Sequence, residues 1–278
     1  GMDAILPILT DKIDDEVLRA AGPQLKIVAN YAVGFDNIDL AACKKRNVME
    51  TNAPGPETVE SVAEHTFALI LALAHRIVES DKFTRAGKYQ GWGPMLLLGA
   101  DVYKKTLGII GLGRIGFAVA NRAVKGFNMK TIYNDPRQNP DFEKQYGGRF
   151  ADLPTLLRES DFVSLHVPLL LSTRHLISVK QFALMKPSAF LINTARGPVI
   201  DEKALVAALK HKKIAGAGID VYEHEPNLTA GLAKLENVIL TPHTASATVE
   251  TRQAMSRTAA QNIIAALEGK TPPNLVRT

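Results

Sequence analysis

Three side chains suited to acid–base and carboxylate chemistry lie in the second half of the chain. They are Arg196, Glu225 and His243, and each follows a run of apolar residues that predicts a buried strand. In open α/β sheets ligands bind beyond the carboxyl ends of the strands. We therefore expect these three side chains to converge on one crevice.

Reduction of a 2-keto acid needs the chemistry that these residue types offer. A guanidinium binds a carboxylate with two parallel hydrogen bonds, and an imidazole donates a proton to a carbonyl oxygen that becomes negative. Glu225 would hold the ring of His243 and favour its protonated form. His224, beside Glu225, competes for the role of proton donor. The alternative interpretations are structural: a salt bridge for Arg196, a turn carboxylate for Glu225 and a buried, hydrogen-bonded imidazole for His243.

A glycine motif precedes these residues. Gly111-Leu-Gly113-Arg-Ile-Gly116 directly follows the predicted strand Leu107–Ile110 and opens a helical pattern over Phe117–Val124. At such a turn the first glycine allows the tight bend, the second lets a pyrophosphate approach, and the third allows close helix packing. The free N–H groups of the helix would then bind phosphates.

An acidic residue ends the next predicted strand. Asp135 lies 19 positions after Gly116, where a carboxylate accepts hydrogen bonds from the adenosine ribose and favours NAD over NADP. Arg137 could instead meet a 2′-phosphate. Asp135 could also cap the turn before Pro136.

These residues must be positioned by an alternation of strands and helices. In the first part of the chain it predicts strands over Ala4–Leu9, Leu25–Asn30 and Val48–Thr51, with helices between them. Ala53-Pro-Gly-Pro56 interrupts the pattern, and a long helical segment follows over Thr58–Gly87.

From Thr106 the alternation restarts with six buried strands, enough for a complete doubly wound sheet. They are predicted over 107–110, 131–133, 162–166, 189–193, 216–221 and 238–241. A last helix, Val249–Leu267, should pack back on the first part. We expect a substrate domain of residues 1–54 and 244–278 around an NAD-binding domain of residues 55–243.

Composition excludes several classes of protein. Hydrophobic residues make up 46% and charged residues 22% of the 278, typical of a globular chain. The net charge of +5 is scattered, which argues against nucleic-acid binding. The most apolar stretch, Phe67–Ala74, is too short to span a membrane. The one cysteine, Cys43, excludes an internal disulfide and favours a reducing, cytoplasmic compartment. We assign no metal ligands.

With these motifs in order, the chain resembles the D-isomer-specific 2-hydroxyacid dehydrogenases, and within them the glyoxylate and hydroxypyruvate reductases. The resemblance covers nearly the whole chain and rests on six stretches: Asn30–Asp39, Gly111–Gly116, His166–Pro168, Asn193–Gly197, Asp220–Pro226 and Thr241–His243.

The resemblance implies a Rossmann cofactor domain, a smaller flavodoxin-like substrate domain, and a role for each matched residue. Arg196, Glu225 and His243 would be catalytic, and Asp220 would hold the nicotinamide carboxamide. The implied cofactor-binding residues are Gly111, Gly113, Arg114, Ile115, Gly116, Asp135, His166, Val167, Pro168, Thr173, Thr194, Ala195, Asp220 and His243. The substrate-binding residues would be Leu9, Val33, Gly34, Trp92, Arg196 and His243.

The resemblance also bears on partners. Gly91-Trp-Gly-Pro94 is similar to a segment that reaches into the partner subunit's substrate cleft, which implies a homodimer through the cofactor domain, with the Thr58–Gly87 helix at the interface. The alternative for Trp92 is a core anchor. A related phosphite-oxidising enzyme carries a lysine where this chain has Val33, so phosphite is disfavoured.

Family members begin with a further strand, helix, strand and helix before the segment that matches Met2–Leu9. The substrate domain is therefore expected to be incomplete here, with Ala4–Leu9 as an exposed edge strand. A second function hypothesis is a nicotinamide sensor that recruits other proteins without turnover, as corepressors that resemble this family do.

Overall fold

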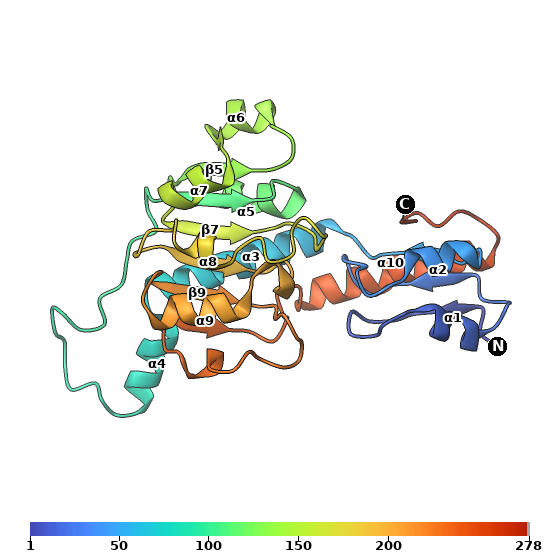
Figure 1. The fold of residues 1–278 in the computed structure, drawn as a ribbon, viewed down its shortest axis with the longest axis horizontal. Helices are drawn as coiled ribbons and strands as arrows, with labels where there is room; N and C mark the ends of the chain where they lie inside the picture. The colour runs from blue at the N-terminus through green and yellow to red at the C-terminus, as the bar shows by residue number, and fades with distance from the viewer. Residues whose placement is uncertain (277–278) are drawn as a thin grey trace. The chain divides into compact units, whose positions relative to one another are not determined.

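All strands of the computed structural model, which describes residues 1–276, run parallel to their neighbours. The chain divides into two units. One is Gly1–Ser61 together with the chain from Ser246 onward, and the other is Val62–Ala245. Both combine a parallel sheet with helices, which confirms the predicted α/β class (Figure 1).

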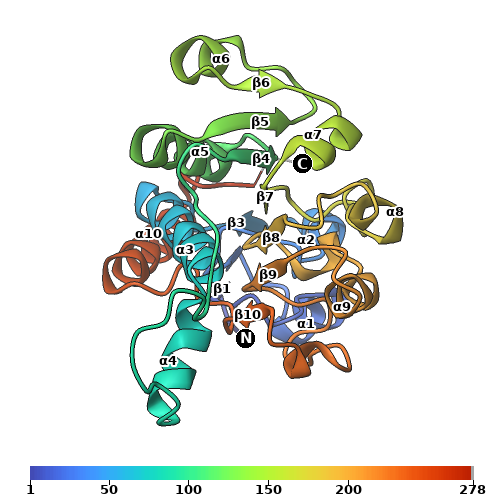
Figure 2. The ribbon, with the colours of Figure 1, turned by 90° about the vertical axis from the view of Figure 1, so that its left-hand side faces the viewer.

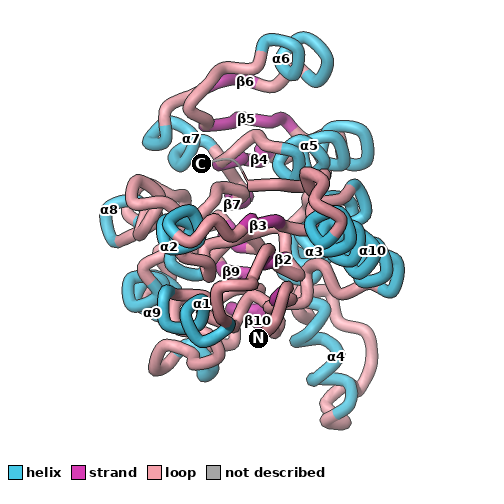
Figure 3. The backbone as a smooth tube through the Cα atoms, turned by 90° about the vertical axis from the view of Figure 1, so that its right-hand side faces the viewer, coloured by secondary structure: helices cyan, strands magenta, loops and turns pink. Residues whose placement is uncertain are grey.

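The first unit is a small sheet covered on both faces. Its strands are ordered β1-β2-β3, and Val28 of β2 packs with Leu18 and Cys43 on one face. Ile27 and Ala29 pack with Ala266 of the last helix on the other face. α1 and α2 thus lie on one side of these strands and α10 on the other (Figure 3). The bounds are β1 Ala4–Ile5, α1 Asp15–Ala21, β2 Ile27–Ala29, α2 Leu40–Lys45, β3 Met49–Thr51 and α10 Val249–Leu267.

The edges of this sheet differ. β1 is an edge strand, as predicted, but it covers two residues instead of the predicted Ala4–Leu9. Pro7, which has no N–H, follows it closely. The outer edge of β3 is met by the end of the chain, where the Val276 N–H donates to the Glu50 carbonyl.

Burial raises the pKa of the Cys43 thiol to about 12, so this cysteine behaves as an apolar side chain.

The second unit holds a seven-stranded sheet in the order β10-β9-β8-β7-β4-β5-β6. The sheet has α3 and α5 on one face and α7, α8 and α9 on the other (Figure 2). The strands are β4 Thr106–Ile110, β5 Lys130–Asn134, β6 Arg149–Phe150, β7 Phe162–Leu165, β8 Phe190–Asn193, β9 Gly216–Ile219 and β10 Val238–Leu240. The helices are α4 Ile77–Arg85, α5 Arg114–Phe127, α6 Pro140–Tyr146, α7 Leu153–Glu159, α8 Val179–Phe182 and α9 Glu202–Lys210, together with α3 Pro56–Ala74, whose first turns belong to the first unit.

This order is that of a doubly wound Rossmann sheet, which confirms the predicted fold. The chain turns from one half of the sheet to the other at β4, which lies between β5 and β7. The prediction of six strands missed β6. Its two residues are exposed, so they form no buried run that a pattern could show.

The prediction of one continuous helix over Thr58–Gly87 is wrong. It is broken at Arg76, which has a left-handed backbone with φ of 53°. The Ala74 carbonyl accepts from the Ala100 N–H at 2.8 Å, a partner from a distant segment. No single helix among residues 1–276 is long and apolar enough to span a membrane; α3 and α4, bent by 59°, pass that test only as a pair.

Candidate active site

The turn between β4 and α5 can be built only with glycine at two positions. Gly111 has a φ of 92°, and a side chain there would lie 2.8 Å from the His166 carbonyl oxygen. A side chain at Gly116 would clash with the carbonyl of Gly111. The turn therefore brings α5 close to the ends of β4 and β7, at the point where the sheet changes direction.

Gly113 is different, because a side chain there would meet no protein atom within 4 Å. It is the N-cap residue of α5, has a φ of −72°, and makes no side-chain cap. Arg114, Ile115 and Gly116 form the first helical turn behind it. The open space in front of a helix N-terminus fits a phosphate, so the residues present suit a dinucleotide.

Asp135 lies beside this turn, after β5. One carboxylate oxygen accepts from the Leu112 N–H at 2.9 Å, and the other accepts from the Arg137 N–H at 3.2 Å. The carboxylate thus caps the turn before Arg137 and also contacts the glycine turn, and its binding to the adenosine ribose stays a prediction. The side chain of Arg137 is exposed.

The segment after β7 forms the other side of the switch point. His166 Nε2 is 2.8 Å from the Ser164 hydroxyl, and the His166 N–H donates to the Ile110 carbonyl. Thr173 donates to the Pro168 carbonyl at 2.6 Å and so closes the loop that begins with Val167. Burial lowers the pKa of His166 from 6.5 to about 3, which keeps this imidazole neutral.

Glu225 and His243 form the central contact of the site. His243 Nδ1 is 3.0 Å from Glu225 Oε2, and the two side chains are 29% and 27% exposed. Burial raises the pKa of Glu225, but the hydrogen bonds from His243 and from the Tyr222 N–H outweigh it, so the net pKa is lowered. Glu225 is therefore an ionised carboxylate that faces an imidazole.

Arg196 is the third member of the predicted set. Its positive charge also lowers the pKa of Glu225, and its Nη1 donates to the Ala195 carbonyl at 2.8 Å. The next residue, Gly197, packs so tightly on the backbone of Tyr222 that a side chain there would overlap it. The loops that carry Arg196 and Glu225 are therefore in direct contact. His224, the other candidate for proton donor, is exposed. The histidine that Glu225 contacts is His243.

Asp220 is fully buried and holds the segment that carries His243. Its carboxylate accepts from the Thr241 hydroxyl at 2.6 Å and from the N–H groups of Thr244 and Ala245 at 2.8 and 2.9 Å. Its binding to a nicotinamide carboxamide stays a prediction. Among residues 1–276, no group of three or more His, Cys, Asp or Glu side chains is arranged to hold a metal ion.

The remaining predicted residues lie elsewhere. In the first unit the Val33 and Gly34 carbonyls accept from the side chains of Asn52 and Asn30, and Leu9 lies in a neighbouring turn. Trp92 is 84% exposed, so its interpretation as a core anchor is wrong.

Sequence reasoning missed a contact made by α3. His65 has its Nε2 3.1 Å from the Thr241 hydroxyl, and the neighbouring Thr66 lies 3.0 Å from the hydroxyl of Thr194. No local pattern marks these pairs, because the partners lie 176 and 128 positions apart.

The chain is similar over most of its length to known proteins. The model of the "D-isomer specific 2-hydroxyacid dehydrogenase, NAD binding domain" matches residues 67–245. The chain is 54% identical to a glyoxylate reductase of Korarchaeum cryptofilum, over 99% of this chain and 82% of that protein.

Two solved structures are similar over 99% of this chain. A D-lactate dehydrogenase from Aquifex aeolicus, complexed with NAD and lactic acid, has a TM-score of 0.90, 35% identity and 87% coverage of its own chain. An NADPH-dependent glyoxylate/hydroxypyruvate reductase from Sinorhizobium meliloti has a TM-score of 0.88, 32% identity and 85% coverage.

The open space at Gly113 generates a test of the phosphate site. Gly113→Ala should lower the free energy of unfolding by no more than about 1 kcal/mol, because the methyl group meets no protein atom and only the N-cap preference for glycine over alanine is lost. It should weaken NADH binding about tenfold, because the methyl group fills the space for the pyrophosphate. Fluorescence titration measures the affinity, and Gly126→Ala, equally open at the other end of α5, is the control. Equal NADH affinity in the two variants would contradict the assignment.

The lowered pKa of His166 predicts a pH-dependent stability. In the unfolded chain the His166 imidazole has its ordinary pKa of 6.5 and is protonated below that pH. In the folded protein it stays neutral down to about pH 3. Stability is therefore complete well above pH 6.5 and decreases as the pH falls through it, by about 1.4 kcal/mol between pH 7.5 and 5.5. Urea unfolding without nucleotide should show this loss, and His166→Gln, which does not titrate, should lose less. Parallel curves for the two proteins would refute the prediction.

Proposed function

Because the chain belongs to the D-isomer-specific 2-hydroxyacid dehydrogenases, we propose that it reduces glyoxylate or hydroxypyruvate to the D-2-hydroxy acid with a nicotinamide cofactor. The observation that carries the proposal is the 3.0 Å contact between Glu225 and His243, beside Arg196, at the carboxyl ends of the strands. This set supplies a proton donor, a group that orients it, and a cation for a carboxylate.

The proton is held and delivered by His243. The carboxylate of Glu225 accepts the hydrogen on Nδ1, which fixes the ring and leaves Nε2 as the atom that faces the substrate. In the reduction Nε2 donates its proton to the substrate carbonyl oxygen while a hydride adds to the carbonyl carbon. In the reverse reaction Nε2 takes the hydroxyl proton back. Glu225 stays ionised and stabilises the charged ring.

The substrate carboxylate is bound by Arg196. A guanidinium matches the two oxygens of a carboxylate, and binding there fixes which substrate atom meets His243. We assign the other substrate contacts by family membership to Leu9, Val33, Gly34 and Trp92. We also propose that the first unit is the substrate domain of the protein.

NAD, when bound, supplies or accepts the hydride. Gly111, Gly113 and the first turn of α5, with Arg114 and Ile115, would hold its pyrophosphate, and Asp135 its adenosine ribose. The further contacts are assigned to His166, Val167, Pro168, Thr173, Thr194, Ala195 and Asp220. Asp135 favours NAD, since its carboxylate would repel a 2′-phosphate, and the lone buried cysteine favours a cytoplasmic location.

The alternative of a sensor without turnover is not favoured. A sensor must bind the dinucleotide, but it does not need an imidazole that a carboxylate holds in place for proton transfer. Here Glu225 and His243 are in contact beside Arg196, and the curated relative is described as a glyoxylate reductase.

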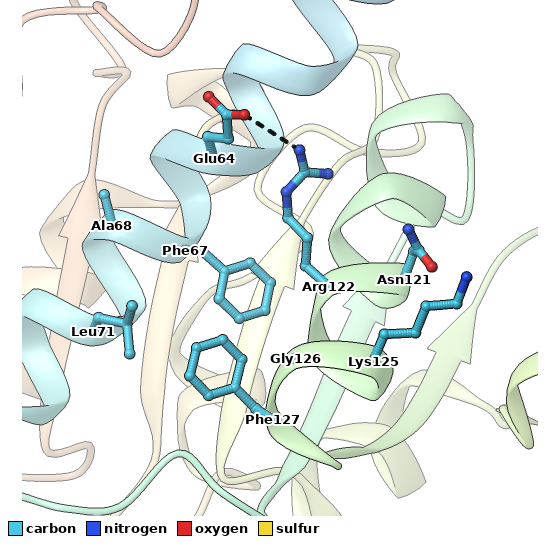
Figure 4. A pocket seen from close by; sticks show the side chains of 9 residues that line it. All are labelled: Glu64, Phe67, Ala68, Leu71, Asn121, Arg122, Lys125, Gly126 and Phe127. Carbon is cyan, nitrogen blue, oxygen red and sulfur yellow. Dashed lines mark hydrogen bonds and ion pairs between the residues drawn. The ribbon is translucent and has the colours of Figure 1, made fainter.

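We also propose that the protein is a homodimer through its cofactor unit. Large apolar side chains are exposed on α4 and on the segment that follows it: Ile77, Val78, Tyr89, Trp92, Met95, Leu96, Leu98 and Tyr103. Beside α3 and α5 lies an open pocket of about 610 Å³, lined by the apolar side chains of Phe67, Leu71 and Phe127 and by the charged side chains of Glu64, Arg122 and Lys125 (Figure 4). Such an apolar surface is typical of a subunit interface.

Assays with NADH test the enzyme assignment. NADH should be consumed with glyoxylate or hydroxypyruvate faster than with phenylpyruvate, and faster than NADPH is. His243→Ala should lower kcat by about 100-fold or more, because it removes the proton donor, while the affinity for NADH stays nearly unchanged. Unchanged turnover in this variant would remove His243 from the reaction, and no turnover with any keto acid would favour the sensor.

Light scattering tests the dimer. The mass in solution should be twice the 30.2 kDa of one chain. The double variant Ile77→Glu/Leu98→Glu should become monomeric, because it places charges within the apolar surface. Val179→Glu, which changes an exposed apolar residue on α8, should leave the mass unchanged. A monomeric wild type would rule the interface out.

A further inference from the structure

One helix contacts the ends of three strands that lead into the site. His65 of α3 lies 3.1 Å from the hydroxyl of Thr241, which follows β10, and 3.5 Å from the carboxylate of Asp220, which follows β9. Thr66, the next residue, meets Thr194 after β8. These strand ends carry His243, Glu225 and Arg196, so α3 is bonded to each loop that supplies a member of the set.

The donor and the acceptor of each of these hydrogen bonds follow from the protons that each group carries. Burial raises the pKa of Asp220, but its hydrogen bonds, with that from His65 the largest, lower it below its ordinary value, so the carboxylate is ionised and can only accept. The hydroxyl of Thr241, at 2.6 Å, must donate its one hydrogen to Asp220. Thr241 then accepts from His65, whose Nε2 carries a hydrogen. The chain of donors runs from His65 through Thr241 to Asp220.

This chain ends on the backbone that carries His243. The Asp220 carboxylate accepts from the N–H groups of Thr244 and Ala245, and the Asp220 carbonyl accepts from the His243 N–H at 2.8 Å. His243 itself has a φ of 53°, in the left-handed region that a non-glycine residue adopts only when its surroundings impose it. Three N–H bonds to one buried residue impose it here.

We propose that His65 is a positioning residue for the reaction. Through Thr241 it orients the Asp220 carboxylate, and Asp220 in turn holds the strained backbone that directs the ring of His243 at Glu225. The inference rests on the proposed function, because it takes His243 as the proton donor. His65 touches neither substrate nor cofactor in this account, and its contribution is the N–H that it donates.

Substitutions at position 65 separate a donated hydrogen from simple packing. His65→Leu removes the donor and should lower kcat about tenfold, with the KM for the keto acid and the affinity for NADH changed less than about twofold. His65→Gln keeps an N–H at the place of Nε2 and should retain kcat within about threefold of the wild type. His211→Gln, an exposed histidine at the end of α9, is the control.

Two results would overturn the proposal. One is a wild-type kcat in His65→Leu. The other is an equal loss in His65→Gln and His65→Leu, which would mean that side-chain shape matters and the hydrogen does not. Because leucine at a position packed on polar groups could unfold its surroundings, Thr241→Val tests the same chain with a side chain of equal size. It should show the kcat loss of His65→Leu, and a wild-type kcat would contradict the relay.

A readout without turnover distinguishes this inference from the proposed function. The hydrogen bond between His243 and Glu225 can be followed by NMR in the protein without cofactor, through the chemical shift of Nδ1 in histidine labelled in the ring. In Glu225→Gln the Nδ1 resonance should move because the carboxylate is lost, and in His65→Leu it should move in the same direction. If the wild type has no turnover, the proposed function fails, and an unmoved Nδ1 resonance in His65→Leu would contradict the positioning role separately.

Discussion

Parallel strands all present their carboxyl ends at the same edge of a sheet, and this constraint organises the second unit. Each strand must be followed by a crossover before the next, so each is followed by a loop at that edge. The glycine turn, Arg196, Glu225 and His243 belong to four such loops. Residues far apart in the chain become neighbours there without any local signal between them.

Within that edge, the energetics depend on a few buried charges. Asp220 has lost its contact with water and keeps its ionised form because four groups of the protein donate to it or face it. The same donors fix the segment after β10, so the desolvation of one carboxylate is coupled to the placement of one imidazole. Glu225 differs, since it is partly exposed and stays ionised through His243 and Arg196. The Asp220 carboxylate therefore holds the backbone after β10, whereas the Glu225 carboxylate orients the imidazole of His243.

The space around the three glycines of the β4–α5 turn separates those that the fold itself requires from the one that it does not. Gly111 and Gly116 are required by the fold itself, because side chains there would strike neighbouring carbonyls. Gly113 is required by nothing in the protein, which is the expected property of a position kept small for a ligand. The large apolar side chains exposed on α4 and on the following segment, Trp92 among them, are likewise typical of a surface that a partner covers.

The sequence alone determined the α/β alternation, the glycine turn, the last helix and the candidate acid–base residues, because each depends on residues close together in the chain. Hydrophobic period, turn chemistry and strand-to-helix spacing are local properties. Only the tertiary structure decided the break between α3 and α4, where the Ala100 N–H donates to the Ala74 carbonyl, and the 3.0 Å contact between His243 and Glu225. It also decided the contact of His65 with Thr241, because hydrogen bonds between distant segments exist only after the sheet has brought them to one edge.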